Sequence, residues 1–388
     1  MKNKPVIYLD YSATTPMDET VLKSMYPYFS MDFGNPSSIH HYGQKAEQAL
    51  EESRNTIASF LGCKSQEVIF TSGGTESDNL ALRGVALARK KDRSANHILI
   101  SPVEHQAVSS TAKQLNQLFG FELELLKVDR FGMISPEQLR QQIRDTTALV
   151  SIIYANNEIG TVNPIPELAK VCQEYSVPFH TDAVQATAYL PMDTQALGID
   201  LLSIGAHKFY GPKGVGLLYV KENTPILPIQ TGGNHERGLR SGTPNIPYIV
   251  GMAAAINLVQ THQPEWIKEL TPLRDQIIHH TLTNIPGSQL TGHPSLRLPN
   301  HTSFVFEGID SQKLLMLLDL EGFACSSGSA CKTGNHLPSD VLLTLGFSPQ
   351  LALSSLRVTL GKETTQAHIE QFLVTLEKTI AKICSRKT

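Results

Sequence analysis

The chain has 388 residues, of which 41% are hydrophobic and 18% are charged, an ordinary balance for a folded globular protein. This length exceeds what one hydrophobic core normally supports, so we predict a large domain and a smaller one. The net charge of −3 supplies no basic surface for a phosphate backbone, and direct binding of nucleic acid is not expected.

The beginning of the chain, MKNKPVIYLDYSATTP, has two lysines but no apolar signal segment, and no later stretch approaches 18 uninterrupted apolar residues. We therefore expect a cytoplasmic protein that does not enter a membrane. The cysteines are odd in number and widely spread, unlike a secreted disulfide framework, and they form no C-x-x-C pair, so no metal site is predicted. They are Cys63, Cys172, Cys325, Cys331 and Cys384.

Short β-branched runs alternate with amphipathic helical patterns along the first two thirds of the chain. This alternation predicts an α/β fold with a mostly parallel sheet covered by helices. The runs are 67–70, 97–101, 148–154, 177–180, 200–204 and 216–220. After about residue 260, long helices at roughly 263–284 and 364–386 flank strands near 302–306 and 355–360. We predict a large domain at 15–258 and a small α+β domain formed by 1–14 and 259–388.

The segment TSGGTESDN (71–79) follows a strand and opens a helix. Its glycines and the first amides of the helix are suited to an anionic phosphate group. A capping box formed by Thr75 and Asp78 is the structural alternative.

Two further polar segments follow predicted strands. His105 is placed where an imidazole can stack on a planar cofactor or move protons, although a single histidine is also common in a structural role. Asn156 and Asn157 precede Glu158 and Gly160, a pattern that is also typical of a turn. Ligands of parallel sheets bind where strands end, so one shared pocket is expected for these residues.

Asp182 and Lys208 each stand at the end of an apolar strand. Lysine can form a Schiff base with the aldehyde of pyridoxal phosphate, and a carboxylate keeps the pyridine nitrogen of that cofactor protonated. A structural Asp–Lys salt bridge is the alternative, since buried charges are rare unless they are paired.

Two segments of the last third of the chain also carry chemistry. In ACSSGSACKTGNH (324–336), small residues surround two thiols, and Lys332 beside Cys331 favours a reactive thiolate. An accidental surface cysteine is the alternative, and a Cys325–Cys331 disulfide is disfavoured in the cytosol. Arg357 alternates with apolar residues in SSLRVTLG (354–361), so its guanidinium either is solvated or binds a carboxylate in the pocket.

Together these segments resemble the group I cysteine desulfurases of the NifS and IscS type. This class V aminotransferase-like family contains pyridoxal-phosphate enzymes of fold type I that supply sulfur for iron–sulfur clusters. The resemblance runs nearly end to end, and SSGSAC together with AHKFYGPKG is its most specific part. The matching segments are YLDYSATTP (8–16), GNPSSIH (34–40), TSGGTESDNLAL (71–82), EHQAV (104–108), NNEIG (156–160), HTDAVQ (180–185), AHKFYGPKG (206–214), HERGLRSGT (235–243), SSGSAC (326–331) and SSLRVTLG (354–361).

The resemblance implies a large domain with a mostly parallel seven-stranded sheet, a smaller α+β domain, and pyridoxal 5'-phosphate as cofactor. It also implies a role for each matching residue. Lys208 would link the cofactor, Asp182 would contact its ring nitrogen, Gln185 would bond its phenolic oxygen, and His105 would stack on its ring. The phosphate would be bound by Gly74, Thr75 and His207 of the same subunit and by Thr243 of a second subunit. Asn157 would contact the cofactor and, with Arg357, the substrate carboxylate, and Cys331 would accept the sulfur.

The implied function is conversion of L-cysteine to L-alanine, with the sulfur held on Cys331 as a persulfide for an acceptor protein such as an iron–sulfur scaffold. The alternatives are a selenocysteine lyase, a C–S lyase or an aminotransferase of the same fold, and, outside catalysis, an idle dimeric platform that binds scaffold proteins. One position departs from the pattern. Many relatives have a serine where this chain has Gly205, so one phosphate contact is expected to be missing.

Overall fold

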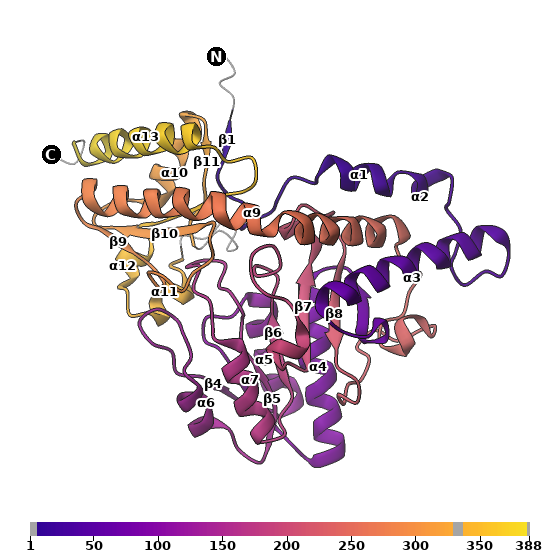
Figure 1. Cartoon of the computed structure of the whole chain (residues 1–388). Coiled ribbons are helices and arrows are strands. Elements are labelled where there is room, and N and C mark those ends of the chain that lie inside the picture. Colours follow the sequence, from indigo (N-terminus) through magenta and orange to yellow (C-terminus); the bar gives the residue numbers. More distant parts are fainter. Residues whose placement is uncertain (1–5, 329–336, 386–388) are drawn as a thin grey trace.

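A seven-stranded sheet forms the centre of the large part of the molecule (Figure 1). In this computed structural model, which describes residues 6–328 and 337–385, the strand order is β2-β8-β7-β6-β5-β3-β4. Within that sheet only β8 runs antiparallel to its neighbours, which confirms the predicted α/β fold with a mostly parallel sheet. The strands are β2 (Val68–Thr71), β3 (His97–Ile100), β4 (Glu122–Leu125), β5 (Thr147–Ser151), β6 (Phe179–Asp182), β7 (Leu201–Gly205) and β8 (Gly216–Val220).

Helices account for most of the remaining described chain. None of them combines the length and the apolar character that a membrane crossing needs. They are α1 (Glu19–Met25), α2 (Pro27–Ser30), α3 (His41–Leu61), α4 (Gly74–Arg93), α5 (Gln106–Phe119), α6 (Pro136–Gln142), α7 (Ile165–Glu174), α8 (Thr194–Leu197), α9 (Ile246–Asn284), α10 (Ser311–Leu320), α11 (Asp340–Thr344), α12 (Pro349–Ala352) and α13 (Gln366–Ser385), with short 3-10 turns η1 (Ser65–Glu67), η2 (Ala206–Lys208) and η3 (His235–Gly238).

Both faces of the central sheet are buried, because side chains alternate between two apolar layers along each strand. Leu201 and Leu218 pack in the layer that contains apolar residues of α4 and α5. Leu202 and Leu217, their chain neighbours, pack in the layer that contains residues of α3, α7 and α9. This burial explains why the strands read as continuous apolar runs in the sequence.

The edge strand β4 was not among the strands predicted from the sequence. Its four residues, Glu-Leu-Glu-Leu, are partly or fully exposed, and the strand pairs only with β3 in the described sheet. A short exposed strand with two glutamates lacks the apolar run by which the other strands were recognised.

A second, smaller sheet lies beside α9, α10 and α12. Its strands are antiparallel in the order β12-β10-β9, and a parallel pair β1-β11 joins the beginning of the chain to this region. The two strands predicted near 302–306 and 355–360 are confirmed. The strands are β1 (Ile7–Tyr8), β9 (Ser288–Leu290), β10 (His301–Phe306), β11 (Phe323–Ala324) and β12 (Ser355–Thr359).

The long helix predicted from residue 263 in fact begins at Ile246. Proline is common near the start of a helix, but here Pro264 and Pro272 both lie inside α9. The helix contacts α3 at one part of its length and α13 at another, as Figure 1 shows. The proposed domain boundary at residue 258 therefore falls within one continuous helix.

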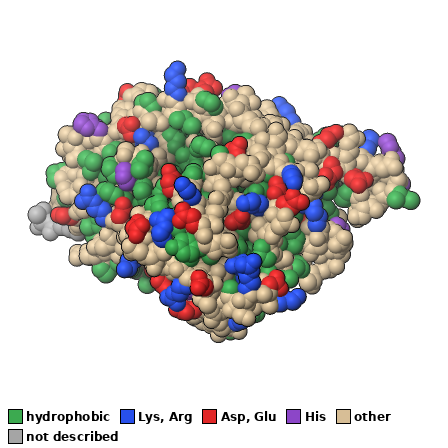
Figure 2. All heavy atoms as spheres, turned by 60° about the horizontal axis from the view of Figure 1, so that its bottom comes forward, with side chains coloured by type: hydrophobic (Ala, Val, Ile, Leu, Met, Phe, Trp, Pro, Cys, Tyr) green, Lys and Arg blue, Asp and Glu red, His purple; other side chains and the backbone are tan. Residues whose placement is uncertain are grey.

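Positive and negative side chains are interspersed on the face seen in Figure 2. Exposed side chains of opposite charge also pair with one another. Arg144 contacts both Glu122 and Glu124, and Arg140 contacts Glu174 at 2.9 Å. Such exposed pairs contribute little to stability, but they leave no large region of a single charge on this face.

Candidate active site

The predicted site residues meet in one cavity at the ends of the strands of the central sheet. Its volume is about 320 Å³, smaller than a hollow of about 790 Å³ beside β1 and α13 that holds none of them. Of the predicted site residues that the structure describes, all but Thr243 line the cavity. The lining residues are Ser12, Ala13, Gly74, Thr75, Asp78, His105, Ile153, Asn157, Asp182, Val184, Gln185, His207, Lys208 and Arg357.

Lys208 is held by the segment that follows β1. The lysine ends the short turn η2 directly after β7, and its Nζ donates hydrogen bonds to the carbonyl oxygens of Ser12 and Ala13, at 2.5 and 2.7 Å. Gln185 Nε2 donates to the same Ser12 oxygen at 2.8 Å. The segment YLDYSATTP thus forms one wall of the cavity, although the sequence assigned no role to its Ser12 or Ala13.

Asp182 ends β6 and is buried. Its Oδ1 accepts a hydrogen bond from the backbone N–H of Val184 at 2.9 Å. Burial raises the pKa of Asp182, while His105, the bond from Val184 and Lys208 act in the opposite direction. Within the described residues no ion pair joins Asp182 to Lys208, which leaves the simple salt bridge without support.

The turn between β2 and α4 is shaped to receive an anion. Gly73 caps α4 without a side-chain bond, so first-turn amides of a 20-residue helix have no side-chain acceptor there. Thr75 is the second residue of the helix and Asp78 is buried within it, so the predicted capping-box alternative is wrong. A Cβ atom on Gly74 would lie 2.6 Å from Val184 Cγ2, which requires glycine at that position.

His207 lies beside this turn and is neutral at ordinary pH. Burial, and the nearby charges of Lys208 and Lys213, lower the pKa of His207 to about 4. Its Nδ1 is 3.0 Å from Thr14 Oγ1. A neutral imidazole can donate a hydrogen bond to phosphate from its protonated nitrogen without adding a charge to the cavity.

Gly205 ends β7 opposite the same turn, at the position where the family resemblance predicts a serine. A Cβ atom at residue 205 would lie 3.3 Å from Gly74 N, a tight contact that a shift of a few tenths of an ångström relieves. We predict that Gly205→Ser adds a hydroxyl contact and strengthens binding of pyridoxal phosphate several-fold, since one hydrogen bond contributes about 1 kcal/mol. Absorbance titration with the cofactor measures this, and Gly205→Ala is the matched control. If Gly205→Ser binds the cofactor no more tightly than Gly205→Ala does, the hydroxyl group adds nothing to the affinity.

His105 caps α5 with its side chain and also lines the cavity. Its Nδ1 accepts a hydrogen bond from Ala107 N at 3.2 Å, which fixes the orientation of the ring. The structural role of His105 is therefore confirmed. Its stacking on a cofactor stays a prediction, with which a ring fixed at the cavity wall is compatible.

Arg357 reaches the cavity from β12 of the smaller sheet. The side chain is buried, so the solvated alternative is wrong. Its Nη1 donates to the carbonyl oxygen of Asn157 at 3.0 Å, and its Nη2 contacts Asp10 Oδ1 at 2.8 Å. The neighbouring Asn156 makes the turn bonds that its sequence predicted, with Glu158 N and Ile159 N. Asn157 is thereby placed in the cavity lining next to Arg357.

Asp78 is a cavity residue whose role the sequence did not reveal. Oxygen and nitrogen atoms of Asp78, His105 and Asp182 all lie within 4.8 Å of one another. Burial, and the nearby charge of Asp182, raise the pKa of Asp78 well above its usual range. Two buried carboxylates this close share a proton, and His105 and Lys208 favour the charged form of Asp182. In the sequence, the polar segment 71–79 looks like a helix cap, and nothing in it indicates that Asp78 lies beside Asp182.

One described site residue lies away from the cavity lining. Thr243 is exposed in the loop that precedes α9. Cys331, the predicted sulfur acceptor, lies outside the described residues. Cys325 is half-buried after β11, and burial, together with Asp10 and Asp319, raises the pKa of its thiol.

His180, two residues before Asp182, makes the folded state sensitive to acid. It is completely buried between Ser151 Oγ, 2.8 Å from Nδ1, and Ser203 Oγ, 3.0 Å from Nε2. Burial lowers the pKa of His180 to about 3, below its ordinary value of 6.5. Because the pKa of His180 is lower in the folded state than in the unfolded state, its contribution to stability is complete above the unfolded-state pKa. That contribution is lost as the pH falls toward the folded-state pKa.

We therefore predict that acidification from about pH 6.5 toward pH 3 lowers the free energy of unfolding through His180 by a few kcal/mol. Urea unfolding at fixed protein concentration measures the loss. In His180→Asn, which keeps a hydrogen-bonding amide, the slope over this interval should be smaller. An unchanged slope in that variant would show that His180 is not the responsible group. Burial raises the pKa of Asp78 and Glu104 instead, so these carboxyls act in the opposite direction.

Comparisons with known proteins agree with this arrangement. Residues 7–372 match the family model described as aminotransferase class-V. The chain is 46% identical over 380 residues to a cysteine desulfurase IscS of Dictyoglomus turgidum, covering 98% of this chain and 96% of that protein. It is 43% identical to a cysteine desulfurase IscS of Methanosarcina thermophila, covering 98% of this chain and 93% of that protein.

A solved structure of a NifS-like protein superimposes with a TM-score of 0.90 at 34% identity, covering 97% of this chain and all of that one. The chain therefore belongs to the aminotransferase class-V family and, within it, to the cysteine desulfurases of the IscS and NifS type, which are enzymes that depend on pyridoxal 5'-phosphate.

Proposed function

We propose that this chain binds pyridoxal 5'-phosphate at Lys208 and converts L-cysteine to L-alanine while Cys331 receives the sulfur. One observation carries the proposal: a single cavity unites a lysine, a buried carboxylate and a buried arginine that come from three separate strands or the turns after them. Lys208 follows β7, Asp182 ends β6, and Arg357 comes from β12. These are the groups that a cofactor aldehyde, a pyridine nitrogen and an amino-acid carboxylate require.

The residues of the cavity fit this cofactor. The uncapped start of α4 offers amides to its phosphate, and Gly74 leaves space where a Cβ atom would meet Val184. Gln185, His207 and Thr75 would add polar contacts from the cavity walls. Asp182 is a buried carboxylate with few competing partners, a suitable match for a protonated ring nitrogen. When bound, the cofactor supplies an electron sink that makes the α-proton of cysteine easier to remove.

The chain's own residues then bind the substrate and move protons. Arg357 has a planar guanidinium suited to the substrate carboxylate, with the side chain already fixed by Asn157 and Asp10. Lys208 is the amine within the cavity that can take up the α-proton and return a proton to the product. Burial of Arg357 keeps bulk water from competing for its hydrogen bonds.

Sulfur transfer requires a nucleophile, which we propose to be the Cys331 thiolate. Its sulfur attacks the sulfur of the substrate, an S–S bond forms, and the Cβ–S bond breaks. The bonding electron pair remains with the substrate, whose Cβ takes up a proton on the way to alanine. The transferred sulfur is oxidised and Cβ is reduced by the same two electrons, so no external oxidant is needed. An acceptor protein, such as an iron–sulfur scaffold, would then receive the sulfur from the persulfide.

We further propose that the chain acts as a homodimer. Large apolar side chains are exposed between residues 17 and 42, among them Phe33 at 64% and Ile39 at 93% exposure. Exposed apolar groups gathered in this way are typical of a surface that another molecule covers. A second copy would also bring its Thr243 to the phosphate. Light scattering should give twice the chain mass of 42.6 kDa, and a stable monomer with full activity would contradict this.

Reduction with borohydride in the presence of pyridoxal phosphate tests the cofactor assignment. We expect the label on the peptide that contains Lys208, because reduction fixes the cofactor to the amine that held it. Lys213 lies on a peptide close by and is the internal control, since it faces the hollow beside α13. An unlabelled protein would instead favour the idle scaffold-binding platform.

A further inference from the structure

The loop at 230–243, between β8 and α9, has a strained backbone. Glu236 and Arg237 adopt left-handed conformations with φ of 45° and 56°. Such values are unfavourable for residues with a side chain and persist only where the surrounding structure enforces them. The loop ends at the exposed Thr243, the residue proposed to reach a second subunit.

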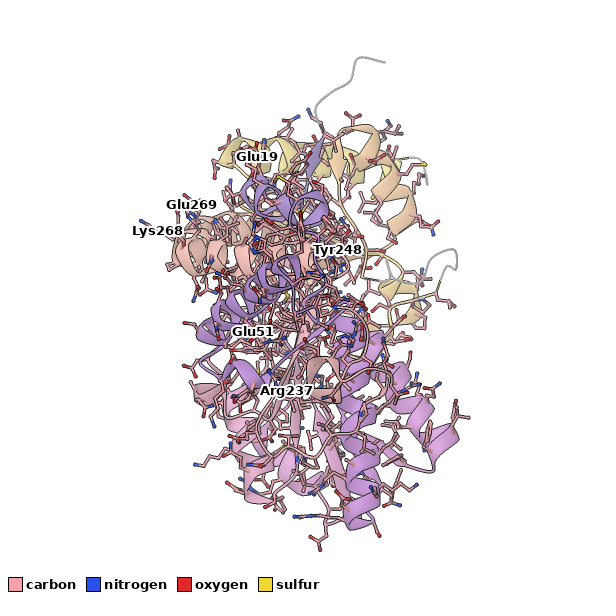
Figure 3. All side chains as sticks on the ribbon, turned by 90° about the vertical axis from the view of Figure 1, so that its right-hand side faces the viewer. Glu19, Glu51, Arg237, Tyr248, Lys268 and Glu269 are labelled. Carbon is pink, nitrogen blue, oxygen red and sulfur yellow. The ribbon has the colours of Figure 1, made fainter. Side chains whose placement is uncertain are left out.

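One ion pair holds the strained part of the loop. Arg54 of α3 contacts both carboxylate oxygens of Glu236 at 2.8 Å, and each side chain is only 5% exposed. Glu236 also accepts a hydrogen bond from the backbone N–H of Phe70 in β2 at 2.9 Å. Figure 3 shows Arg237 of this loop on the same side of the molecule as Glu51 of α3.

A second ion pair joins the loop to the turn proposed to bind phosphate. Arg240 Nε contacts Glu76 Oε1 at 2.8 Å, with the two side chains 21% and 17% exposed. Glu76 lies in the first turn of α4, next to Thr75, and its other oxygen accepts from Ser72 N at 2.7 Å. Glu76 therefore links Ser72, at the start of the turn, and the first turn of α4 to Arg240.

The charge of Glu76 needs this partner. Burial opposes ionisation, but the bonds from Arg240 and Ser72 outweigh it and lower the pKa of Glu76. An ionised carboxylate at the start of α4 repels a phosphate group bound a residue away. Arg240 cancels that repulsion, because its guanidinium is always charged.

We propose that Glu76 and Arg240 are positioning residues. In each subunit they tie the turn at that subunit's own phosphate site to Thr243, which reaches the phosphate site of the partner. Arg240 stands three residues before Thr243, so fixing its guanidinium on Glu76 sets where Thr243 projects. This inference rests on the proposed cofactor site and homodimer.

Mixed dimers test the inference, because an effect on the partner's site cannot arise from a local change. One subunit carries Lys208→Ala, with or without Arg240→Gln, and the other has the natural sequence. Only the natural subunit can link the cofactor, and it receives Thr243 from the variant subunit. We expect Arg240→Gln to weaken cofactor binding at this single site about tenfold, measured by visible absorbance, which corresponds to about 1.4 kcal/mol.

The control and the contradictory results are distinct. Arg140→Gln removes an exposed ion pair with Glu174 and should leave the affinity unchanged. Arg240→Lys keeps the charge, and it should have a smaller effect and serve if Arg240→Gln fails to fold, as thermal melting will show. Unchanged affinity in both Arg240 variants overturns the positioning role. Absence of a linked cofactor in the dimer without an Arg240 change would instead overturn the proposed function.

Discussion

Replacing Lys208 with alanine is expected to abolish the covalent attachment of the cofactor and to slow alanine formation by at least about 10³-fold. Its Nζ is the cavity amine, oriented by the carbonyl oxygens of Ser12 and Ala13. Without it, the cavity lining that the structure describes holds no other lysine to link the aldehyde or move the α-proton. Visible absorbance reports the attachment, and chromatography of the amino-acid products reports the rate.

Lys213→Ala is the matched control, because this exposed lysine stands five residues further on and lines the hollow beside α13. It should retain both the absorbance and the rate. A Lys208→Ala variant that forms alanine within tenfold of the natural rate would exclude Lys208 as the catalytic amine.

Replacing Cys331 with serine is expected to remove the persulfide and to slow sulfur release by about 100-fold or more, while the cofactor remains bound. A hydroxyl is far less ionised than a thiol at neutral pH and cannot form the S–S bond. Mass spectrometry after incubation with L-cysteine detects the extra sulfur atom on the intact protein.

Cys325→Ser provides the comparison for this second experiment. Burial raises the pKa of the Cys325 thiol, so it is protonated and a poor nucleophile at neutral pH. That variant should keep its persulfide on Cys331 and its rate. If Cys331→Ser turned over at the natural rate with the cofactor in place, the sulfur acceptor would be another group.

Much of the site could be predicted because several functional residues stand at the end of an apolar strand or just after it. The ends of parallel strands meet at one edge, so Asp182 and Lys208 had to lie close together once their strands were recognised. Arg357 was ambiguous for a different reason. Period two shows that a side chain leaves the apolar layer of its own strand, but not whether that face meets solvent or the pocket of another sheet.

The residues that were missed depend on contacts between distant segments. Ser12 and Ala13 contribute backbone carbonyls, which no side-chain pattern reveals. Asp78 resembled a helix cap, and only its burial beside Asp182 shows otherwise. The predicted helix began at about residue 263, whereas α9 begins at Ile246 and packs against α3, a contact with a distant segment of the chain.

The central claim is the conversion of cysteine to alanine, and the identity of the carbon product tests it most directly. The purified chain is loaded with pyridoxal phosphate and incubated with L-cysteine and a thiol reductant, and alanine, pyruvate and sulfide are quantified together. The account predicts one alanine for each sulfide and no pyruvate. Pyruvate and ammonia in place of alanine would contradict it and identify a C–S lyase.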